Sequence, residues 1–282
     1  PFIMIINSYA KINLGLHVLN QREDGFHNIV TIFQEVNFCD KITIEESKTT
    51  SFNTNVDWLS PINNTCIKAV DILKDHYPHI PHFKIRLQKN IPTNAGMGGG
   101  SSNGTAILKA INKSCDLNIE EKKMKELAEK ISADSTFFVN GGLQGGEGKG
   151  EVLTPIKRPL KDQYILLVMP NIKIQTSEAF MFIKKYLVKG QTHVKLSQML
   201  KELQLNKLSS ELFYNDFEMY VFKTHPEIGK IKLEILDLGA KYASLSGSGS
   251  TVFGIFSDKH KAQKAQSFFS PHYSTIIANP KI

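Results

Sequence analysis

The chain has 282 residues, of which 41% are hydrophobic and 22% charged, the proportions of an ordinary globular protein. Its formal net charge of +7 suits anionic partners, such as phosphorylated small molecules or nucleic acid, without choosing among them. No apolar run is long enough to span a bilayer, and no secretory signal is visible. We therefore expect a protein of one large domain or two modest ones, with no membrane segment.

The cysteine and histidine spacings do not indicate a disulfide framework or a zinc site. The three cysteines are far apart and include no Cys-x-x-Cys motif, which favours free thiols in a reducing compartment. Three histidines lie close together but are interrupted by prolines, which favours a surface turn: His76, His79 and His82.

The first half of the chain predicts strands and helices in alternation. Strands are predicted over residues 12–19 and 41–45, followed by a helix over residues 66–73 with Thr65 as its N-cap. The segment of residues 10–17 overlaps the first of these strands, and on a strand its Lys11 and Asn13 share one face. That face either lines a substrate cleft or is the solvated side of an ordinary edge strand.

A glycine-rich segment follows the next predicted strand, residues 83–87, and precedes a helix-compatible run over residues 105–111. Four glycines stand directly before two serines: Gly96, Gly98, Gly99, Gly100, Ser101 and Ser102. A glycine loop that opens a helix offers backbone N–H groups and the positive end of the helix dipole, which together bind phosphate. The segment, here called the glycine loop (residues 96–102), matches neither a Walker A motif nor a dinucleotide fingerprint.

Apolar residues at helical spacing predict a helix over residues 120–131, and Asp134 follows it before another apolar run. Asp134 is either a cap or turn carboxylate, the commoner role, or a general base near a lysine. A second glycine-rich stretch, residues 141–150, favours a hairpin or bulge over another phosphate site.

The second half opens with a buried-strand pattern over residues 164–169, and helical patterns cover residues 177–187 and 227–238. A strand over residues 252–256 and a helix over residues 259–269 complete it. Gly247 and Gly249 alternate with serines just before that last strand, as a tight turn or as a loop packed against phosphate or substrate. The mixed order predicts an α+β fold with domains at residues 1–158 and 159–282.

Three motifs in this order resemble the GHMP small-molecule kinases: the Ala-Lys-Ile-Asn-Leu strand, the Gly-Met-Gly-Gly-Gly-Ser-Ser-Asn loop and the late Gly-Ser-Gly-Ser loop. A fourth, Asp-Gly-Phe-His at residues 24–27, resembles the Asp-Gly-Tyr-His of the 4-diphosphocytidyl-2-C-methyl-D-erythritol kinases. The resemblance spans nearly the whole chain. It implies a two-domain fold, with a ribosomal-protein-like N-terminal domain, a ferredoxin-like C-terminal domain and the active site in the cleft between them.

The resemblance also implies roles for particular residues. Lys11 and Asp134 match the catalytic pair, which implies that they are close in space. Positions expected to bind ATP are Asn64, Lys89, Pro92, Gly96, Met97, Gly98, Gly99, Gly100, Ser101 and Ser102. Positions expected to bind the substrate are Asn13, Phe26, His27, Thr176, Phe180, Gly247 and Ser248. Phe26 and Phe180 would hold the cytosine ring, and His27 would read its polar edge.

The chain departs from the family pattern at a few positions. Tyr9 replaces a proline, Phe26 replaces a tyrosine, Ser135-Thr136 replaces Val-Pro, and Gly104-Thr105 replaces Ala-Ala. None of these changes removes a group that phosphoryl transfer needs, and Phe26 keeps a stacking face.

The implied reaction is transfer of the ATP γ-phosphoryl group to cytidine-diphosphate-linked methylerythritol in non-mevalonate isoprenoid synthesis. Asp134 would accept the hydroxyl proton beside Lys11, and Mg²⁺ would bridge the phosphates with help from Ser102. We expect no stable nucleic-acid partner, a monomer or weak homodimer, and a bacterial cytoplasmic or plastid-stromal location. Two alternatives remain open: another GHMP-fold kinase or ATP-dependent decarboxylase, and a non-catalytic RNA-binding protein.

Overall fold

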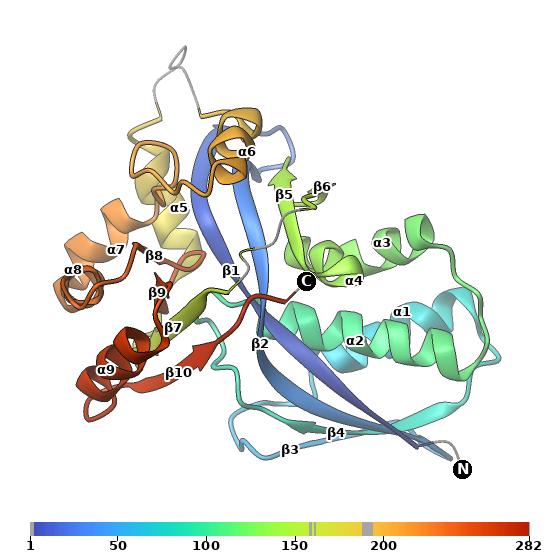
Figure 1. Ribbon diagram of the computed structural model, residues 1–282. Coiled ribbons are helices and arrows are strands. Elements are labelled where there is room, and N and C mark those ends of the chain that lie inside the picture. The colour runs from blue at the N-terminus through green and yellow to red at the C-terminus, as the bar shows by residue number, and fades with distance from the viewer. Residues whose placement is uncertain (1–2, 158–159, 161, 188–193, 282) are drawn as a thin grey trace. The chain divides into compact units, whose positions relative to one another are not determined.

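The computed structural model describes residues 3–157, 160, 162–187 and 194–281 (Figure 1). The chain divides into two compact units that are discontinuous in sequence. The first unit comprises Pro1–Ala10, Phe38–Thr93 and Gly98–Asn140, and the second comprises Lys11–Asn37, Asn94–Met97 and Gly141–Ile282. Strands β1 (Ile3–Gln21) and β2 (His27–Ser47) contribute residues to both. The domain boundary expected between residues 158 and 159 lies outside the described residues.

The first unit is a sheet covered by helices. Its strand β4 (His82–Gln88) pairs in parallel with β3 (Ser51–Thr54) and antiparallel with Lys41–Ser47 of β2. Helix α1 (Thr65–His76) makes the crossover that parallel strands require, and α2 (Gly99–Ser114) packs beside it (Figure 1). The unit is completed by three short elements: α3 (Glu121–Glu129), the 3₁₀ turn η1 (Ala133–Thr136) and α4 (Phe137–Asn140).

The second unit contains an antiparallel sheet in the order β10-β7-β9-β8. Its strands are β7 (Tyr164–Met169), β8 (Tyr242–Leu245), β9 (Val252–Phe256) and β10 (Ser274–Ala278). In chain order this is last, first, third and second, which is the ferredoxin-like arrangement that the resemblance predicts. Its helices are α5 (Thr176–Lys184), α6 (Leu196–Gln204), α7 (Glu218–Thr224), α8 (Pro226–Asp237) and α9 (Lys259–Phe269).

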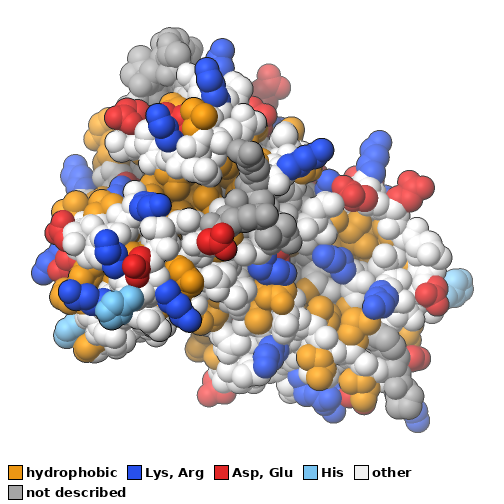
Figure 2. Space-filling model, viewed as in Figure 1, with side chains coloured by type: hydrophobic (Ala, Val, Ile, Leu, Met, Phe, Trp, Pro, Cys, Tyr) orange, Lys and Arg blue, Asp and Glu red, His pale blue; other side chains and the backbone are white. Residues whose placement is uncertain are grey.

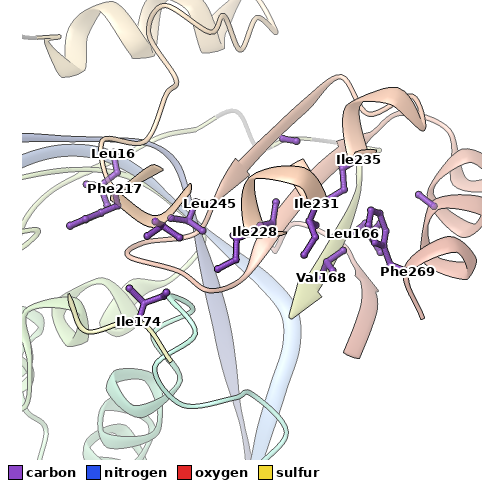
Figure 3. Close-up of a cluster of buried hydrophobic side chains, with 14 of the residues drawn as sticks. Leu16, Leu166, Val168, Ile174, Phe217, Ile228, Ile231, Ile235, Leu245 and Phe269 are labelled. Atoms are coloured by element: carbon purple, nitrogen blue, oxygen red, sulfur yellow. The ribbon is translucent and has the colours of Figure 1, made fainter. Parts of the chain in front are cut away.

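Helix side chains fill the core of the second unit against this sheet. Figure 3 shows Ile228, Ile231 and Ile235 of α8 beside Leu166 and Val168 of β7, all of them buried. The three isoleucines follow the i, i+3, i+7 spacing of an amphipathic helix, so one stripe of α8 is buried. This stripe fixes α8 on the sheet that carries the loop between β8 and β9.

The glycine-rich stretch at residues 141–150 forms a hairpin, as predicted. Strand β5 (Leu143–Glu147) pairs antiparallel with β6 (Val152–Pro155), and also with Thr31–Gln34 of β2. Gly145 and Gly146 lie where a Cβ atom would come within 2.7 Å of Leu196 and 2.5 Å of Phe33, respectively. Glycine is therefore needed there for close packing.

Two local predictions were wrong, and one alternative that the sequence left open is excluded. The N-cap of α1 is Asn64, whose side chain accepts a hydrogen bond from Cys66 N at 2.9 Å, and Thr65 is the first helical residue. The predicted strand at residues 12–19 is not an edge with a solvated face, because residues 10–18 are buried on both faces. The helix predicted over residues 177–187 ends at Lys184.

Charged side chains of both signs are mixed on the molecular surface. On the face in Figure 2, Lys and Arg lie among Asp and Glu on each unit, with hydrophobic side chains between them. Among the described residues, no helix is both long and apolar enough to cross a membrane.

Candidate active site

The glycine loop leads into the N-terminus of α2. Gly96 and Gly98 have positive φ values of 76° and 65°, a backbone conformation that side chains disfavour. Gly98 is the N-cap and provides no side-chain hydrogen bond to the first turn. The first N–H groups of α2 are thus not capped by a side chain of the cap residue, which leaves an anion-binding helix terminus.

The start of the glycine loop packs backbone to backbone against the loop between β8 and β9, here called the serine loop (residues 246–250). Ser246 Oγ donates a hydrogen bond to the Gly96 carbonyl at 2.9 Å, and a Cβ atom on Gly96 would meet Ser246 O at 1.8 Å. Gly247 likewise approaches the Gly96 carbonyl. The serine loop therefore packs against Gly96, and only glycine fits at this position.

A buried ion pair supports the first turn of α2. Lys89 Nζ donates to Asp40 Oδ2, and both side chains are almost completely buried. Asp40 also accepts hydrogen bonds from three further groups, the Asn90 and Ile91 backbone N–H groups at 2.7 and 2.8 Å and Asn103 Nδ2 at 2.9 Å. Burial lowers the pKa of Lys89, and Asp40 opposes that shift. The ammonium of Lys89 thus pairs with a carboxylate of its own unit.

The two glycines at the start of α2 differ in what surrounds them. A Cβ atom on Gly99 would meet Lys89 Nζ at 2.9 Å and Ile91 Cγ2 at 3.0 Å. On Gly100 the nearest neighbours would be Thr65 side-chain atoms at 3.8 Å. Gly99 therefore faces the buried ion pair, whereas a Cβ atom on Gly100 would make only ordinary van der Waals contacts.

A short chain of polar groups holds the second serine of the loop. Asn103 Nδ2 donates to Ser8 Oγ at 2.9 Å, and Ser8 Oγ donates to Ser102 Oγ at 2.7 Å. All three residues are buried. Because Ser102 accepts here, its own proton and a second lone pair remain for other partners.

The remaining predicted ATP contacts lie near the loop. Asn64 caps α1, and the residue after it, Thr65, donates from Oγ1 to the Gly100 carbonyl at 2.7 Å. Pro92 is exposed between β4 and α2. Met97 is buried, and its carbonyl accepts a hydrogen bond from the Lys11 backbone N–H at 3.0 Å.

Lys11 and Asn13 interact on β1, as their shared face predicts. Lys11 Nζ donates to Asn13 Oδ1 at 2.7 Å, and Asn13 Nδ2 donates to Thr31 Oγ1 at 3.0 Å. Thr31 Oγ1 in turn donates to the Gly15 carbonyl at 2.5 Å, so it can only accept from Asn13. Thr31 thereby fixes which end of the Asn13 amide faces Lys11, a role that the sequence did not reveal.

The residues expected to bind cytidine form two contacting pairs, and Phe26 is exposed on the β1–β2 turn. His27 and Phe180 are stacked, with ring centroids 5.1 Å apart and an interplanar angle of 15°. Phe26 is 55% exposed, with Lys149 Nζ 5.2 Å from its ring centroid. Thr176 Oγ1 lies 2.8 Å from Ser248 Oγ of the serine loop.

His27 presents a buried polar atom at this place. Among the described residues, its Nε2 atom has no hydrogen-bond partner. Burial, with a smaller contribution from the charge of Lys184, lowers the pKa of His27 below its ordinary value. The imidazole is therefore held towards its neutral form, in which one ring nitrogen donates and the other accepts.

Asp134 lies in η1 and is half-buried. It belongs to the first unit and Lys11 to the second. Their expected proximity therefore stays a prediction, like the other role assignments.

Comparison with known proteins identifies the family. The model of the GHMP kinases N terminal domain matches residues 64–142, and that of the GHMP kinases C terminal domain matches residues 185–275. The 4-diphosphocytidyl-2-C-methyl-D-erythritol kinase of Parabacteroides distasonis is 40% identical over 271 residues, 95% of this chain and 96% of that protein. The kinase of the same name from Thermodesulfovibrio yellowstonii is 33% identical, over 98% of this chain and 97% of its own. This chain belongs to the 4-diphosphocytidyl-2-C-methyl-D-erythritol kinase family of GHMP kinases.

Solved structures agree on the fold. A crystal structure of 4-(cytidine 5'-diphospho)-2C-methyl-D-erythritol kinase superposes with a TM-score of 0.84 at 24% identity, covering 99% of this chain and 100% of that one. The mevalonate kinase of Methanococcus jannaschii gives a TM-score of 0.72 at 17% identity, covering 100% and 99%. The predicted α+β GHMP kinase fold is confirmed.

Proposed function

We propose that this chain transfers the γ-phosphoryl group of ATP to the 2-hydroxyl of 4-diphosphocytidyl-2-C-methyl-D-erythritol, a step of non-mevalonate isoprenoid synthesis. The relationship to kinases of that name, at 33% to 40% identity over nearly the whole chain, carries the proposal. Phosphate binding is supported by the N-terminus of α2, which has no side-chain cap. It follows the glycine loop, in which only glycine fits at position 96.

Phosphoryl transfer depends mainly on positioning and on neutralising charge. The N–H groups of the glycine loop would bind the β- and γ-phosphates, and Asp134 would accept the proton of the attacking hydroxyl. Lys11, held by Asn13 at 2.7 Å, would stabilise negative charge on the attacking oxygen. The Asn13–Thr31 hydrogen bond would keep that ammonium in place.

Nucleotide recognition would come from the aromatic side chains near the β1–β2 turn. Phe26, largely exposed, would stack on cytosine, and Phe180 would do so only with a face that His27 does not cover. Each such stack is worth roughly 1–3 kcal/mol in nucleic-acid binders. The unpaired Nε2 atom of His27 would read the polar edge of the base. Stacking tolerates any base, so this edge contact would set the preference for cytosine.

We expect a magnesium ion to bind together with the nucleotide, because Mg²⁺ in such enzymes is usually held by substrate phosphates and few protein side chains. No cluster of three or more His, Cys, Asp or Glu side chains suited to a metal occurs among the described residues. The phosphates would supply most of its ligands. Ser102 Oγ would add one more through its second lone pair, because the hydrogen bond from Ser8 occupies only the first. The ion would neutralise charge on the phosphates.

Substitution of the proposed proton acceptor tests this assignment. We expect Asp134→Asn to lower kcat at least ~10²-fold, the usual scale for a positioned proton acceptor, while both ligands still bind. Coupled ADP release measures kcat, and isothermal titration measures binding. Asp116→Asn, on an exposed turn, is the matched control. Near-normal turnover in folded Asp134→Asn protein would exclude Asp134 from the reaction.

A further inference from the structure

Buried hydroxyl groups connect the turn that carries Asp134 to the glycine loop. Thr105 Oγ1, on α2, lies 2.9 Å from the Ser101 carbonyl and 3.0 Å from the Ser135 carbonyl. Thr105 and Ser135 are completely buried. Since a hydroxyl group has only one proton, the two carbonyls share it, one from α2 and one from η1.

A second connection runs through side chains alone. Ser132 Oγ donates to Ser101 Oγ at 2.7 Å and lies 2.7 Å from Ser135 Oγ. Because Ser132 gives its one proton to Ser101, Ser135 must be the donor in the second bond. The chain therefore runs from Ser135 through Ser132 to Ser101, and it leaves the proton of Ser101 to donate beyond the chain. Ser135 Oγ is also 3.4 Å from the Ser101 carbonyl, too far to compete well.

We propose that Thr105, Ser132 and Ser135 are positioning residues that hold the Asp134 turn and Ser101 at a fixed spacing. This inference rests on the proposed function, in which Asp134 accepts a proton while the glycine loop binds the phosphates. Of the departures from the family pattern, Thr105 contributes its side chain to this bond, whereas position 135 contributes only its backbone carbonyl. A displacement of about 1 Å between reacting groups can lower the rate about 10²-fold, so this spacing matters for turnover.

The first test removes the shared hydroxyl without changing side-chain shape. We expect Thr105→Val to lower kcat about tenfold or more, while KM for both substrates and the affinity for ATP stay within about twofold. Thr105→Ser, which keeps the hydroxyl, should restore most of the rate. Ser132→Ala removes only the hydrogen bonds between the serine side chains and should also lower kcat. This variant replaces Thr105→Val in the test if Thr105→Val folds poorly.

The second test asks whether Thr105 acts through Asp134. In an Asp134→Asn background, measured at high enzyme concentration, Thr105→Val should cause little further loss, because the group it positions is gone. A purely stabilising role would leave the two losses additive. The control is Thr224→Val on α7, which removes a similar helical bond from Oγ1 to the Tyr220 carbonyl at 2.9 Å.

The outcomes distinguish a failure of the positioning role from a failure of the proposed function. Normal kcat in both Thr105→Val and Ser132→Ala, or additive losses with Asp134→Asn, would overturn this inference alone. Wild-type protein without turnover on the cytidine substrate would overturn the proposed function and this inference with it.

Discussion

His27 is a titratable side chain whose burial disfavours the protonated form of its ring. Its ring is stacked on Phe180, and its pKa is lowered chiefly by burial and further by Lys184. The folded state therefore binds a proton less readily than the unfolded state, whose histidine has a pKa of about 6.5. Stability from the neutral ring is fully present above pH 6.5 and is lost as the pH falls through the lower, folded value.

We therefore expect His27→Gln, which cannot titrate, to flatten the loss of Tm between neutral pH and pH 5. His260→Gln, at an exposed position on α9, serves as the control for the substitution. Thermal unfolding followed by circular dichroism across this pH range measures the effect. A wild-type profile in His27→Gln would mean that His27 does not titrate differently in the folded state.

The first turn of α2 contains two glycines, Gly99 and Gly100, with different surroundings. Gly99→Ala would place Cβ 2.9 Å from Lys89 Nζ, so we expect it to disturb the Lys89–Asp40 pair and lower Tm. Gly100→Ala meets no close neighbour and should raise helix propensity by up to about 1 kcal/mol. If phosphate binds at this turn, Gly100→Ala should still weaken ATP binding in isothermal titration. Unchanged affinity in Gly100→Ala would mean that the phosphates approach elsewhere.

The serine loop is held in place by Asn215, which the sequence analysis did not single out. Its Nδ2 atom donates to the Leu245 and Gly247 carbonyls, both at 2.8 Å, and Asn215 is buried. Asn215→Ala would remove its hydrogen bonds to the Gly247 and Leu245 carbonyls, of which Leu245 keeps one from Ser244 Oγ at 3.3 Å, and the acceptor of the Phe217 N–H group. We expect a loss of about 2–4 kcal/mol in unfolding free energy. Urea denaturation measures this, with Asn53→Ala on exposed β3 as control. Equal stability of both variants would mean that water replaces the amide.

Most regular elements could be predicted because their residue patterns are local. The isoleucines of α8 and the apolar run of β7 are examples. Adjacent candidates for one role could not be separated: Asn64 and Thr65 are both good N-caps, and only the structure shows that Asn64 caps α1. Strand β8, with four residues, is too short to show a period.

Supporting contacts between distant parts of the chain could not be predicted. Ser8 and Ser102 are 94 residues apart, and Asp40 and Lys89 are 49 apart. Nothing in a single sequence marks such pairs, since a serine or an aspartate is usual on any surface. The motifs therefore identified the glycine loop and Lys11, whereas the side chains that hold them, such as Thr31 and Ser132, came only from the structure.

The whole chain is related in fold to kinases of other substrates, such as mevalonate kinase and homoserine kinase. The most direct test of the proposed function is therefore a comparison of substrates with one purified protein. ADP release and product mass would be measured with ATP, Mg²⁺ and 4-diphosphocytidyl-2-C-methyl-D-erythritol, mevalonate or homoserine. We predict stoichiometric phosphorylation of the cytidine substrate and no product from the other two. Equal or greater turnover of mevalonate or homoserine, or no product from the cytidine substrate, would contradict the account.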